Sequence, residues 1–326
     1  MERLDAFMAR ANAAYYAERN PYADFTTSPE ITQVFGEVLG LWAAVTWDAM
    51  GRPDPVLLAE CGPGRGTLMA DALRAVSGVA APFRAALRVH LVDTSPRLRA
   101  QQAARVPNAA WHDTLSDVPP GPLILLANEF LDALPIRQFV RRGAGWAERF
   151  VEGGALVEQP AAAPDLDFAR AEEGAVMEIC ESARAIAEHV ARRVARDGGA
   201  ALFLDYGPAE SAPGDSLQAL RDGRPAGPLG EPGAADLTAH VDLAALARVA
   251  SAAGAAVHGP MPQGLFLTRL GLFQRTGRLA RTQPPRRAAA LVQAAQRLAE
   301  PDRMGRLFKA MAVCHPALPC PAGFEP

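Results

Sequence analysis

A short glycine-rich segment carries the strongest chemical signal in the sequence. Glu60 precedes Gly62, Gly64 and Gly66, directly after the apolar run 56–59. Glycines between a buried strand and a helix let the backbone turn tightly and approach a bound cofactor, and the start of the helix offers free N–H groups. The spacing here is G-x-G-x-G, whereas nicotinamide-binding loops have G-x-G-x-x-G. The segment therefore predicts a cofactor-binding turn of another kind, with a purely structural turn as the alternative.

The carboxylate beside this turn indicates which cofactor it would bind. Glu60 lies two residues before the first glycine. A carboxylate there favours a cofactor that carries an ammonium group and opposes one that carries a pyrophosphate. The sequence therefore predicts S-adenosylmethionine, with Glu60, Gly62, Gly64 and Gly66 at its methionine end.

Two further acidic residues follow predicted strands. Asp93 ends the apolar segment 87–92, the position from which an acid can accept hydrogen bonds from both ribose hydroxyls in doubly wound folds. Asp113 falls where the next strand should end, and we expect it to bind the adenine amino group. The alternatives are a helix-capping role for Asp93 and a turn-forming role for Asp113.

A third polar group follows the apolar run 123–127. It consists of Asn128, Glu129 and Asp132, with Phe130 between them. Ligands of open parallel sheets bind beyond the carboxyl ends of the strands, near the point where the strand order reverses. An amide oxygen and two carboxylates there could hold an amine or a guanidinium beside a transferring methyl group, and Phe130 could cover it. In the alternative interpretation, these residues cap a turn and are solvated.

Other polar residues carry weaker signals. His240 could act as a base or a substrate contact, although a lone histidine near a helix start is more often a cap or a surface residue. The other histidines lack metal-ligand spacing, and Cys314 and Cys320 have no zinc-binding partners, so we expect no metal. Ser28 lacks the Gly-x-Ser-x-Gly setting of a hydrolase nucleophile.

The elements that position these groups alternate between strands and helices. Apolar runs at 56–59, 87–92, 123–127 and 200–204 are separated by helical segments, which is typical of a parallel α/β sheet. We expect residues 307–313 to add an antiparallel final strand. The sequence thus predicts a Rossmann-like sheet with helices on both of its faces.

Two regions fall outside this alternation. Residues 1–55 predict a helical lid, in which Ser28 caps the second helix and residues 25–30 fold over the cofactor site. We expect residues 56–326 to form the main domain, with three antiparallel strands inserted at about 136–160. The segments 160–165 and 207–234 are rich in Pro, Gly and Ala and predict long loops.

Composition limits the class of protein. Apolar residues make up 49% of the 326 residues, and 33 basic against 36 acidic residues leave a net charge of −3. The chain has no excess of basic residues that would indicate nucleic-acid binding. No apolar run approaches the ~20 residues that a membrane span needs. The acidic start and scattered cysteines predict a cytoplasmic protein without a targeting peptide.

The motifs together resemble one family, the MidA-type class I methyltransferases, which include the mitochondrial complex I assembly methyltransferase. The resemblance covers nearly the whole chain and depends on residues 24–30, 35–37, 40–42, 60–69, 127–135, 205–207, 236–242 and 305–309. It departs from the family pattern at Cys61, where a branched apolar residue is expected, and at Asp93, where Glu is commoner. The resemblance implies a class I methyltransferase fold, S-adenosylmethionine as cofactor, and a protein arginine, on a respiratory complex subunit, as methyl acceptor.

The predicted function is therefore S-adenosylmethionine-dependent methyl transfer, in which Asn128, Glu129 and Asp132 receive the nucleophile. Two alternatives stay open. One is a non-catalytic assembly factor that binds the cofactor and holds a partner subunit of a respiratory complex. The other is a nucleotide-binding oxidoreductase, which the glycine spacing and Glu60 oppose.

Overall fold

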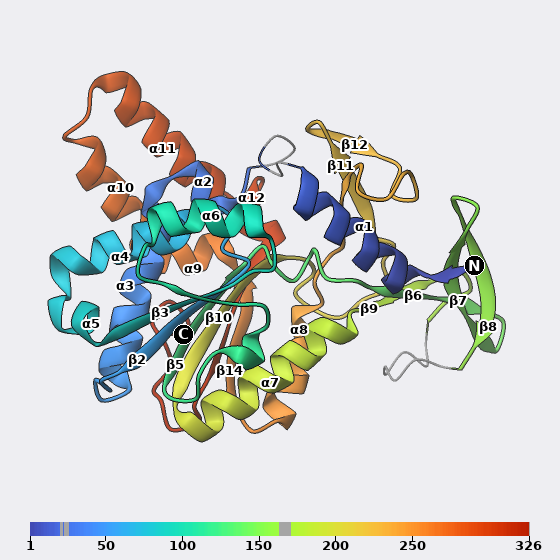
Figure 1. Ribbon diagram of the computed structural model, residues 1–326, viewed down its shortest axis with the longest axis horizontal. Coiled ribbons are helices and arrows are strands. Elements are labelled where there is room, and N and C mark those ends of the chain that lie inside the picture. The colour runs from blue at the N-terminus through green and yellow to red at the C-terminus, as the bar shows by residue number, and fades with distance from the viewer. Residues whose placement is uncertain (20–21, 23–25, 163–170, 326) are drawn as a thin grey trace. The chain divides into compact units, whose positions relative to one another are not determined.

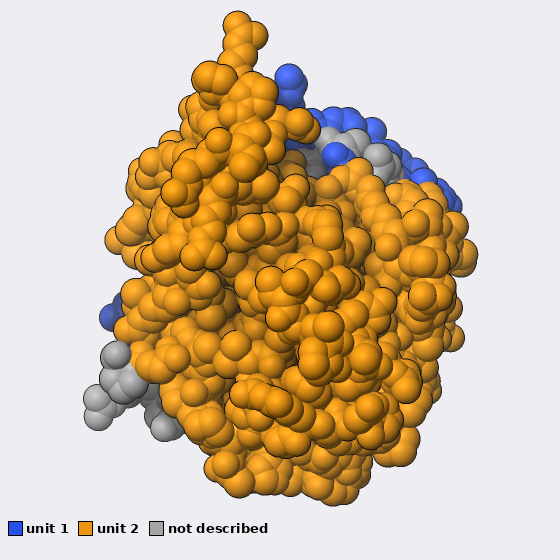
Figure 2. All heavy atoms as spheres, turned by 90° about the vertical axis from the view of Figure 1, so that its left-hand side faces the viewer, with its two compact units in different colours: residues 1–25, 131–185, 210–242 blue, residues 26–130, 186–209, 243–326 orange. Residues whose placement is uncertain are grey.

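The computed structural model describes residues 1–19, 22, 26–162 and 171–325, and its contacts divide the chain into two compact units. Unit 1 comprises residues 1–25, 131–185 and 210–242; unit 2 comprises residues 26–130, 186–209 and 243–326 (Figure 2). This division differs from the predicted boundary at residue 55. Residues 1–25 belong to unit 1, whereas the helices that follow them belong to unit 2.

Unit 2 is built on a seven-stranded sheet with the order β14-β15-β10-β5-β2-β3-β4 (Figure 1). The strands are β2 (Val56–Cys61), β3 (Leu87–Val92), β4 (Ala110–His112), β5 (Leu123–Asn128), β10 (Gly199–Tyr206), β14 (Ala256–Pro262) and β15 (Phe308–Cys314). Neighbouring strands from β4 to β10 are parallel, while β15 pairs antiparallel with both β10 and β14. All residues of β2, β5 and β15 are buried, as continuous apolar strands require. The predicted parallel sheet with an antiparallel final strand is confirmed.

Unit 2 also contains helices, of which some pack on the sheet and others pack on neighbouring helices. They are α2 (Ser28–Ile31), α3 (Gln33–Ala49), α4 (Thr67–Val79), α5 (Ala81–Ala86), α6 (Pro96–Arg105), α7 (Glu181–Asp197, which begins in unit 1), α8 (Leu243–Ala252), α9 (Gln263–Arg269), α10 (Leu272–Ala280), α11 (Pro285–Ala299) and α12 (Met304–Leu307). The core includes Phe35 and Trp42 of α3, which cluster with apolar side chains of α4 and with Leu58 and Ile124 of the sheet. Burial of these aromatic rings anchors α3 to the strands that carry the predicted site.

The start of α3 differs from the prediction. Ser28 was expected to cap one continuous helix, but the helix breaks at Thr32, whose hydroxyl oxygen accepts a hydrogen bond from the Val34 N–H (3.3 Å). Ser28 is instead the first residue of the four-residue helix α2. The prediction was wrong because the extended residue that precedes this helix is Thr27, one position earlier, while the Ser28 N–H donates to Oε1 of Glu129.

Unit 1 is mainly antiparallel. One sheet contains β1 (Glu2–Arg3), β6 (Arg137–Arg142), β7 (Gly145–Glu152), β8 (Ala155–Ala161) and β9 (Val176–Ile179), and α1 (Leu4–Glu18) packs with this unit. A second sheet contains β11 (Gln218–Arg221), β12 (Arg224–Ala226) and β13 (Asp236–Thr238). The three strands predicted within 136–160 are present. The prediction of a long loop at 207–234 was wrong, because β11 and β12 form a hairpin there.

None of the helices within the described ranges has both the length and the apolar character needed to cross a membrane. Among those same residues, His, Cys, Asp and Glu side chains nowhere form a group of three or more that could hold a metal ion.

Candidate active site

The glycine loop joins the end of β2 to the start of α4 and has the geometry that its glycines allow. Gly62, Gly64 and Gly66 all have positive φ, at 64°, 52° and 78°. A Cβ atom at Gly62 would lie 2.8 Å from Cδ2 of Phe130, which is too close for a real contact. The chain therefore needs glycine at this position both for its φ and for the ring that lies against it.

Glu60 is buried beside this loop with one oxygen unsatisfied. The residue is 3% exposed, and its Oε2 atom has no hydrogen-bond partner in the described part of the chain. Burial raises the pKa of Glu60 to about 8, a hydrogen bond from the Met69 backbone opposes this rise, and the charge of Asp93 adds to it. An unpaired buried carboxylate oxygen is costly. A bound ammonium group would satisfy it, so the site fits the predicted cofactor.

Asp93 follows β3 and is held on both of its carboxylate oxygens. Oδ1 accepts a hydrogen bond from the Ser95 N–H (2.8 Å), and Oδ2 accepts one from Nε2 of Gln102 (2.7 Å). Burial raises the pKa of Asp93, and these two hydrogen bonds lower it. A carboxylate oxygen has more than one acceptor position. The positions that remain are compatible with the predicted contacts to ribose hydroxyls.

Asp113 lies next to β4 and is largely exposed. Its Oδ1 accepts a hydrogen bond from Nη2 of Arg99 (2.6 Å), and its side chain is 73% exposed. The Arg99 guanidinium also donates to the backbone oxygens of Asp93 (2.6 Å) and His112 (2.8 Å). Arg99 therefore ties the ends of β3 and β4 together and places Asp113 beside Asp93.

Asn128 and Glu129 end β5, the strand next to β2. The Glu129 Oε1 atom accepts hydrogen bonds from the Ser28 N–H (2.7 Å) and from Nδ2 of Asn128 (3.1 Å). The Oδ1 atom of Asn128 is buried without a partner among the described residues, and burial raises the pKa of Glu129. Glu129 also has a φ of 49°, which is strained for a residue with a side chain. Strain and an unsatisfied acceptor together are typical of a functional position.

Asp132, the last of the predicted site residues, belongs to unit 1. It is 8% exposed, and its backbone oxygen accepts a hydrogen bond from the Ala239 N–H (2.9 Å). His240 also lies in unit 1, with an exposed side chain, and its N–H donates to Oγ of Ser216 (2.8 Å). The roles predicted for these two residues stay predictions.

Glu30 belongs to the predicted lid segment 25–30, but its partners could not be predicted from the sequence. Its Oε1 accepts hydrogen bonds from Oγ1 of Thr67 (2.6 Å) and from Nε of Arg65 (3.2 Å), and its Oε2 pairs with Nη2 of Arg65. The same short helix is held at Ser28 by Glu129. Helix α2 is thus bonded both to the glycine loop and to the turn after β5. Residues 20–21 and 23–25 of the predicted lid, and residues 163–165 of the predicted loop at 160–165, lie outside the described residues.

Gln102 and Asp205 were missed by the sequence interpretation. Gln102 is fully buried on α6 and bonds to both Asp93 and the glycine loop. Asp205, at the end of β10, is 1% exposed, and its carboxylate accepts hydrogen bonds from the N–H groups of Phe130 (3.2 Å) and Tyr206 (2.9 Å). No local spacing marks Gln102, whereas the position of Asp205 at a strand end was a usable signal.

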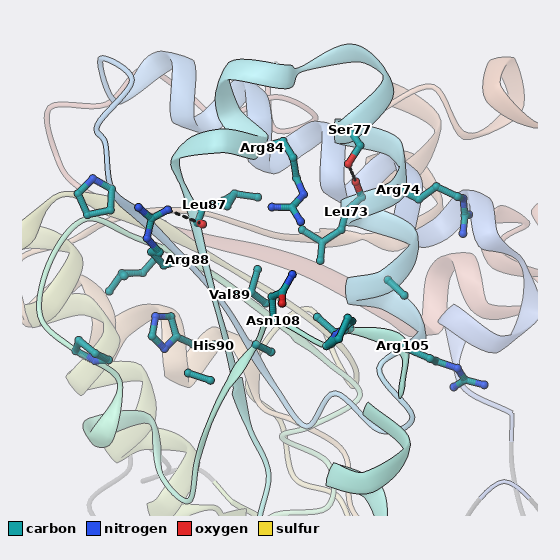
Figure 3. Close-up of a pocket in the computed structure, with 18 of the residues that line it drawn as sticks. Leu73, Arg74, Ser77, Arg84, Leu87, Arg88, Val89, His90, Arg105 and Asn108 are labelled. Atoms are coloured by element: carbon teal, nitrogen blue, oxygen red, sulfur yellow. Dashed lines mark hydrogen bonds between the residues drawn. The ribbon is translucent and has the colours of Figure 1, made fainter. Parts of the chain in front are cut away.

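A groove of about 780 Å³ lies elsewhere on unit 2, and none of the predicted site residues lines it. Four arginines do: Arg74, Arg84, Arg88 and Arg105. Figure 3 shows Arg84 above the groove and Arg74 and Arg105 pointing away from it, while Arg88 bonds to backbone oxygens. The groove therefore lies apart from the polar groups that surround the glycine loop.

Comparison with known proteins decides the family. A family model described as "Putative S-adenosyl-L-methionine-dependent methyltransferase" matches residues 38–261. The chain belongs to this family. The predicted class I methyltransferase fold, enzyme class and S-adenosylmethionine cofactor are therefore confirmed, and the oxidoreductase alternative loses its support.

Several relatives are similar over most of their length. The Homo sapiens protein named "Protein arginine methyltransferase NDUFAF7, mitochondrial" is 35% identical over 96% of this chain and 79% of its own. The Danio rerio protein of the same name is 34% identical over 90% of this chain and 77% of its own. A Burkholderia thailandensis crystal structure with bound S-adenosyl-homocysteine is 27% identical over 99% of this chain and 88% of its own, with a TM-score of 0.79.

These relatives correct one prediction. We expected a cytoplasmic protein, but the Danio rerio, Drosophila melanogaster and Homo sapiens relatives are named as mitochondrial proteins. The acidic start of the chain and its scattered cysteines were poor guides, because composition reports on location only indirectly.

Proposed function

We propose that this methyltransferase transfers a methyl group from S-adenosylmethionine to an arginine side chain of a protein. The observation that carries the proposal is the pairing of two kinds of unsatisfied acceptor on neighbouring strands. Glu60 of β2 has an unpartnered buried carboxylate oxygen, and Asn128 of β5 has an unpartnered amide oxygen beside the Glu129 carboxylate. The Glu60 oxygen suits the ammonium group of the cofactor. The oxygens of Asn128 and Glu129 suit a cationic group that accepts the methyl.

In this proposal the glycine loop holds the cofactor. Glu60 binds its ammonium group, Asp93 binds its ribose hydroxyls and Asp113 binds its adenine amino group. Gly62, Gly64 and Gly66 allow the backbone to approach it, with φ values that other residues avoid. Bound S-adenosylmethionine supplies an electrophilic methyl group on its sulfonium.

The chain's contribution to the transfer is mainly positioning. Asn128 and Glu129 orient the acceptor guanidinium, with Asp132 as a further carboxylate whose contribution rests on the sequence. Alignment of reacting groups is worth several kcal/mol of a reaction barrier. A guanidinium is always charged in water, so it must lose a proton when it is methylated. The Glu129 carboxylate, whose pKa burial raises, is a suitable acceptor for that proton.

The relatives support an arginine of a protein as the acceptor, because their printed names include "protein arginine methyltransferase". The more specific proposal, a subunit of a respiratory complex, comes from the family resemblance of the sequence motifs. The relatives' mitochondrial names are compatible with it.

One observation favours the alternative of a non-catalytic assembly factor that binds the cofactor. Oε1 of Glu129 is already occupied by the Ser28 N–H and the Asn128 amide. If this is its whole role, Glu129 holds α2 in place and does not bind an acceptor.

A labelling experiment tests the proposal. Purified protein and tritiated S-adenosylmethionine are added to an extract from a strain that lacks the gene, and the labelled protein is hydrolysed to amino acids. We expect the label in methylated arginine with the wild type and a large loss with Glu129→Gln. Label in another amino acid, or equal transfer by both proteins, would contradict the proposed acceptor or the role of Glu129.

A further inference from the structure

Gln102 joins three parts of the cofactor region through one side chain. Its Nε2 donates to the backbone oxygen of Gly64 (2.8 Å) and to Oδ2 of Asp93 (2.7 Å), and its Oε1 accepts from Nε1 of Trp111 (2.8 Å). The residue is fully buried at 0% exposure. Both amide hydrogens and the amide oxygen are therefore used inside the protein.

The orientation of this amide follows from its partners. The indole Nε1 of Trp111 can only donate, so Oε1 of Gln102 must face it. Nε2 then faces Gly64 O and Asp93 Oδ2, both of which can only accept. A rotated amide would place like groups together at all three contacts, so one orientation is strongly favoured.

The contacts also fix the distance between two functional groups. Gly64 is in the loop after β2, with positive φ, and Asp93 follows β3. A Cβ atom at Gly66 would lie 3.3 Å from Cα of Gln102, so α6 packs tightly against the loop at this point. Gln102 thus connects the backbone around the cofactor's methionine end to the acid at its ribose end.

We propose that Gln102 is a positioning residue for the cofactor: its amide aligns the Asp93 carboxylate against the glycine loop, and cofactor affinity depends on that alignment. The inference rests on the proposed function, in which Asp93 binds the ribose. Burial raises the pKa of Asp93, and the hydrogen bond from Nε2 of Gln102 opposes that rise, which favours the ionised form as an acceptor.

A merely space-filling role would predict something different. Gln102 would then be replaceable by any side chain of similar volume, with an effect on stability and none on the affinity of the folded protein. Alignment of Asp93 instead requires a donor at the Nε2 position. The substitution Gln102→Glu separates the two roles, because it keeps the shape and replaces this donor with an acceptor.

The test measures the affinity for S-adenosylhomocysteine by calorimetry at pH 8 and at pH 6. At pH 8 the carboxylate introduced by Gln102→Glu faces the Asp93 carboxylate, so we expect binding to be roughly tenfold or more weaker than wild type. At lower pH the two carboxylates share a proton, which restores a donor between them. The ratio of variant to wild-type Kd should therefore fall clearly between pH 8 and pH 6.

Gln101→Glu is the matched control, because it adds the same charge one residue earlier on α6, where the side chain is partly exposed. We expect its Kd to stay within about twofold of wild type at both pH values, since exposed charges interact weakly. If Gln102→Glu does not fold, the affinity of Gln102→Met is measured instead. We expect its Kd to be about tenfold higher than that of wild type, and this ratio to be the same at both pH values.

The outcomes separate this inference from the proposed function. Wild-type protein that does not bind S-adenosylhomocysteine would contradict the proposed cofactor site itself. Wild-type protein that binds, together with Gln102→Glu of equal affinity at pH 8, would overturn only the positioning role. A constant ratio of variant to wild-type Kd across pH would also overturn it.

Discussion

The buried Glu60 carboxyl predicts that cofactor binding is coupled to release of a proton. Burial raises the pKa of Glu60 to about 8, so this carboxyl is mostly protonated at neutral pH in the free protein. The ammonium of the cofactor needs the ionised form as its partner. Binding at neutral pH should therefore expel the proton from Glu60 into solvent.

The magnitude follows from the pKa. Well below pH 8, each pH unit adds about 1.4 kcal/mol to the cost of ionising Glu60. The Kd for S-adenosylhomocysteine should therefore be roughly tenfold higher at pH 6 than at pH 7. The same shift predicts that the free protein loses stability as pH rises from about 4.5 to 8, because only the unfolded chain ionises readily there. Replacing the acid with glutamine should remove that loss.

Calorimetry in two buffers with different ionisation enthalpies measures both effects. At pH 7 we expect release of close to one proton per cofactor bound. Glu60→Gln should bind more weakly, release almost no proton and unfold at a higher denaturant concentration than wild type at pH 8. A pH-independent Kd with no proton release in the wild-type protein would refute this reasoning.

Three other predictions concern the loop, the acceptor residues and α2. Gly62→Ala should abolish S-adenosylhomocysteine binding and lower stability by about 2 kcal/mol or more, measured by calorimetry and urea unfolding, because its Cβ meets the Phe130 ring. Gly51→Ala, with similar φ and open space, is the control and should lose stability alone. Glu129→Gln should reduce methyl transfer roughly ten- to a hundredfold while leaving the Kd for S-adenosylhomocysteine within about threefold; unchanged transfer would exclude an acceptor role. Glu30→Gln should weaken cofactor binding and lower the urea midpoint, because it loses its ion pair with Arg65; unchanged affinity would remove α2 from the site.

The sheet and the glycine loop could be predicted from the sequence because their signals are local. Strands buried on both faces need continuous apolar residues, as at 123–127, and the turn after β2 needs its glycines. The acids after β3 and β5 were found for the same reason, since strand ends are readable from apolar runs.

The features that were missed depend on contacts between distant residues. Ser28 has the sequence of a helix cap, but its N–H bonds to Glu129, and only the folded chain brings these two together. No local sequence pattern distinguishes Gln102 from the other glutamines, because its three partners come from three separate parts of the chain.

One missed element did have a local signal. The hairpin of β11 and β12 turns at Asp222-Gly223, where both residues have positive φ. An Asp-Gly pair between short strands is a strong indicator of such a turn. The surrounding Pro and Gly residues concealed it, because they also favour loops.

A crystal structure of the complex with S-adenosylhomocysteine is the most direct test of the central claim, that the site around Glu60 holds the cofactor. We predict its ammonium within hydrogen-bonding distance of the Glu60 carboxylate, its ribose hydroxyls on Asp93, and Asn128 facing its sulfur. Cofactor bound elsewhere, for example in the groove beneath Arg84, would contradict the account.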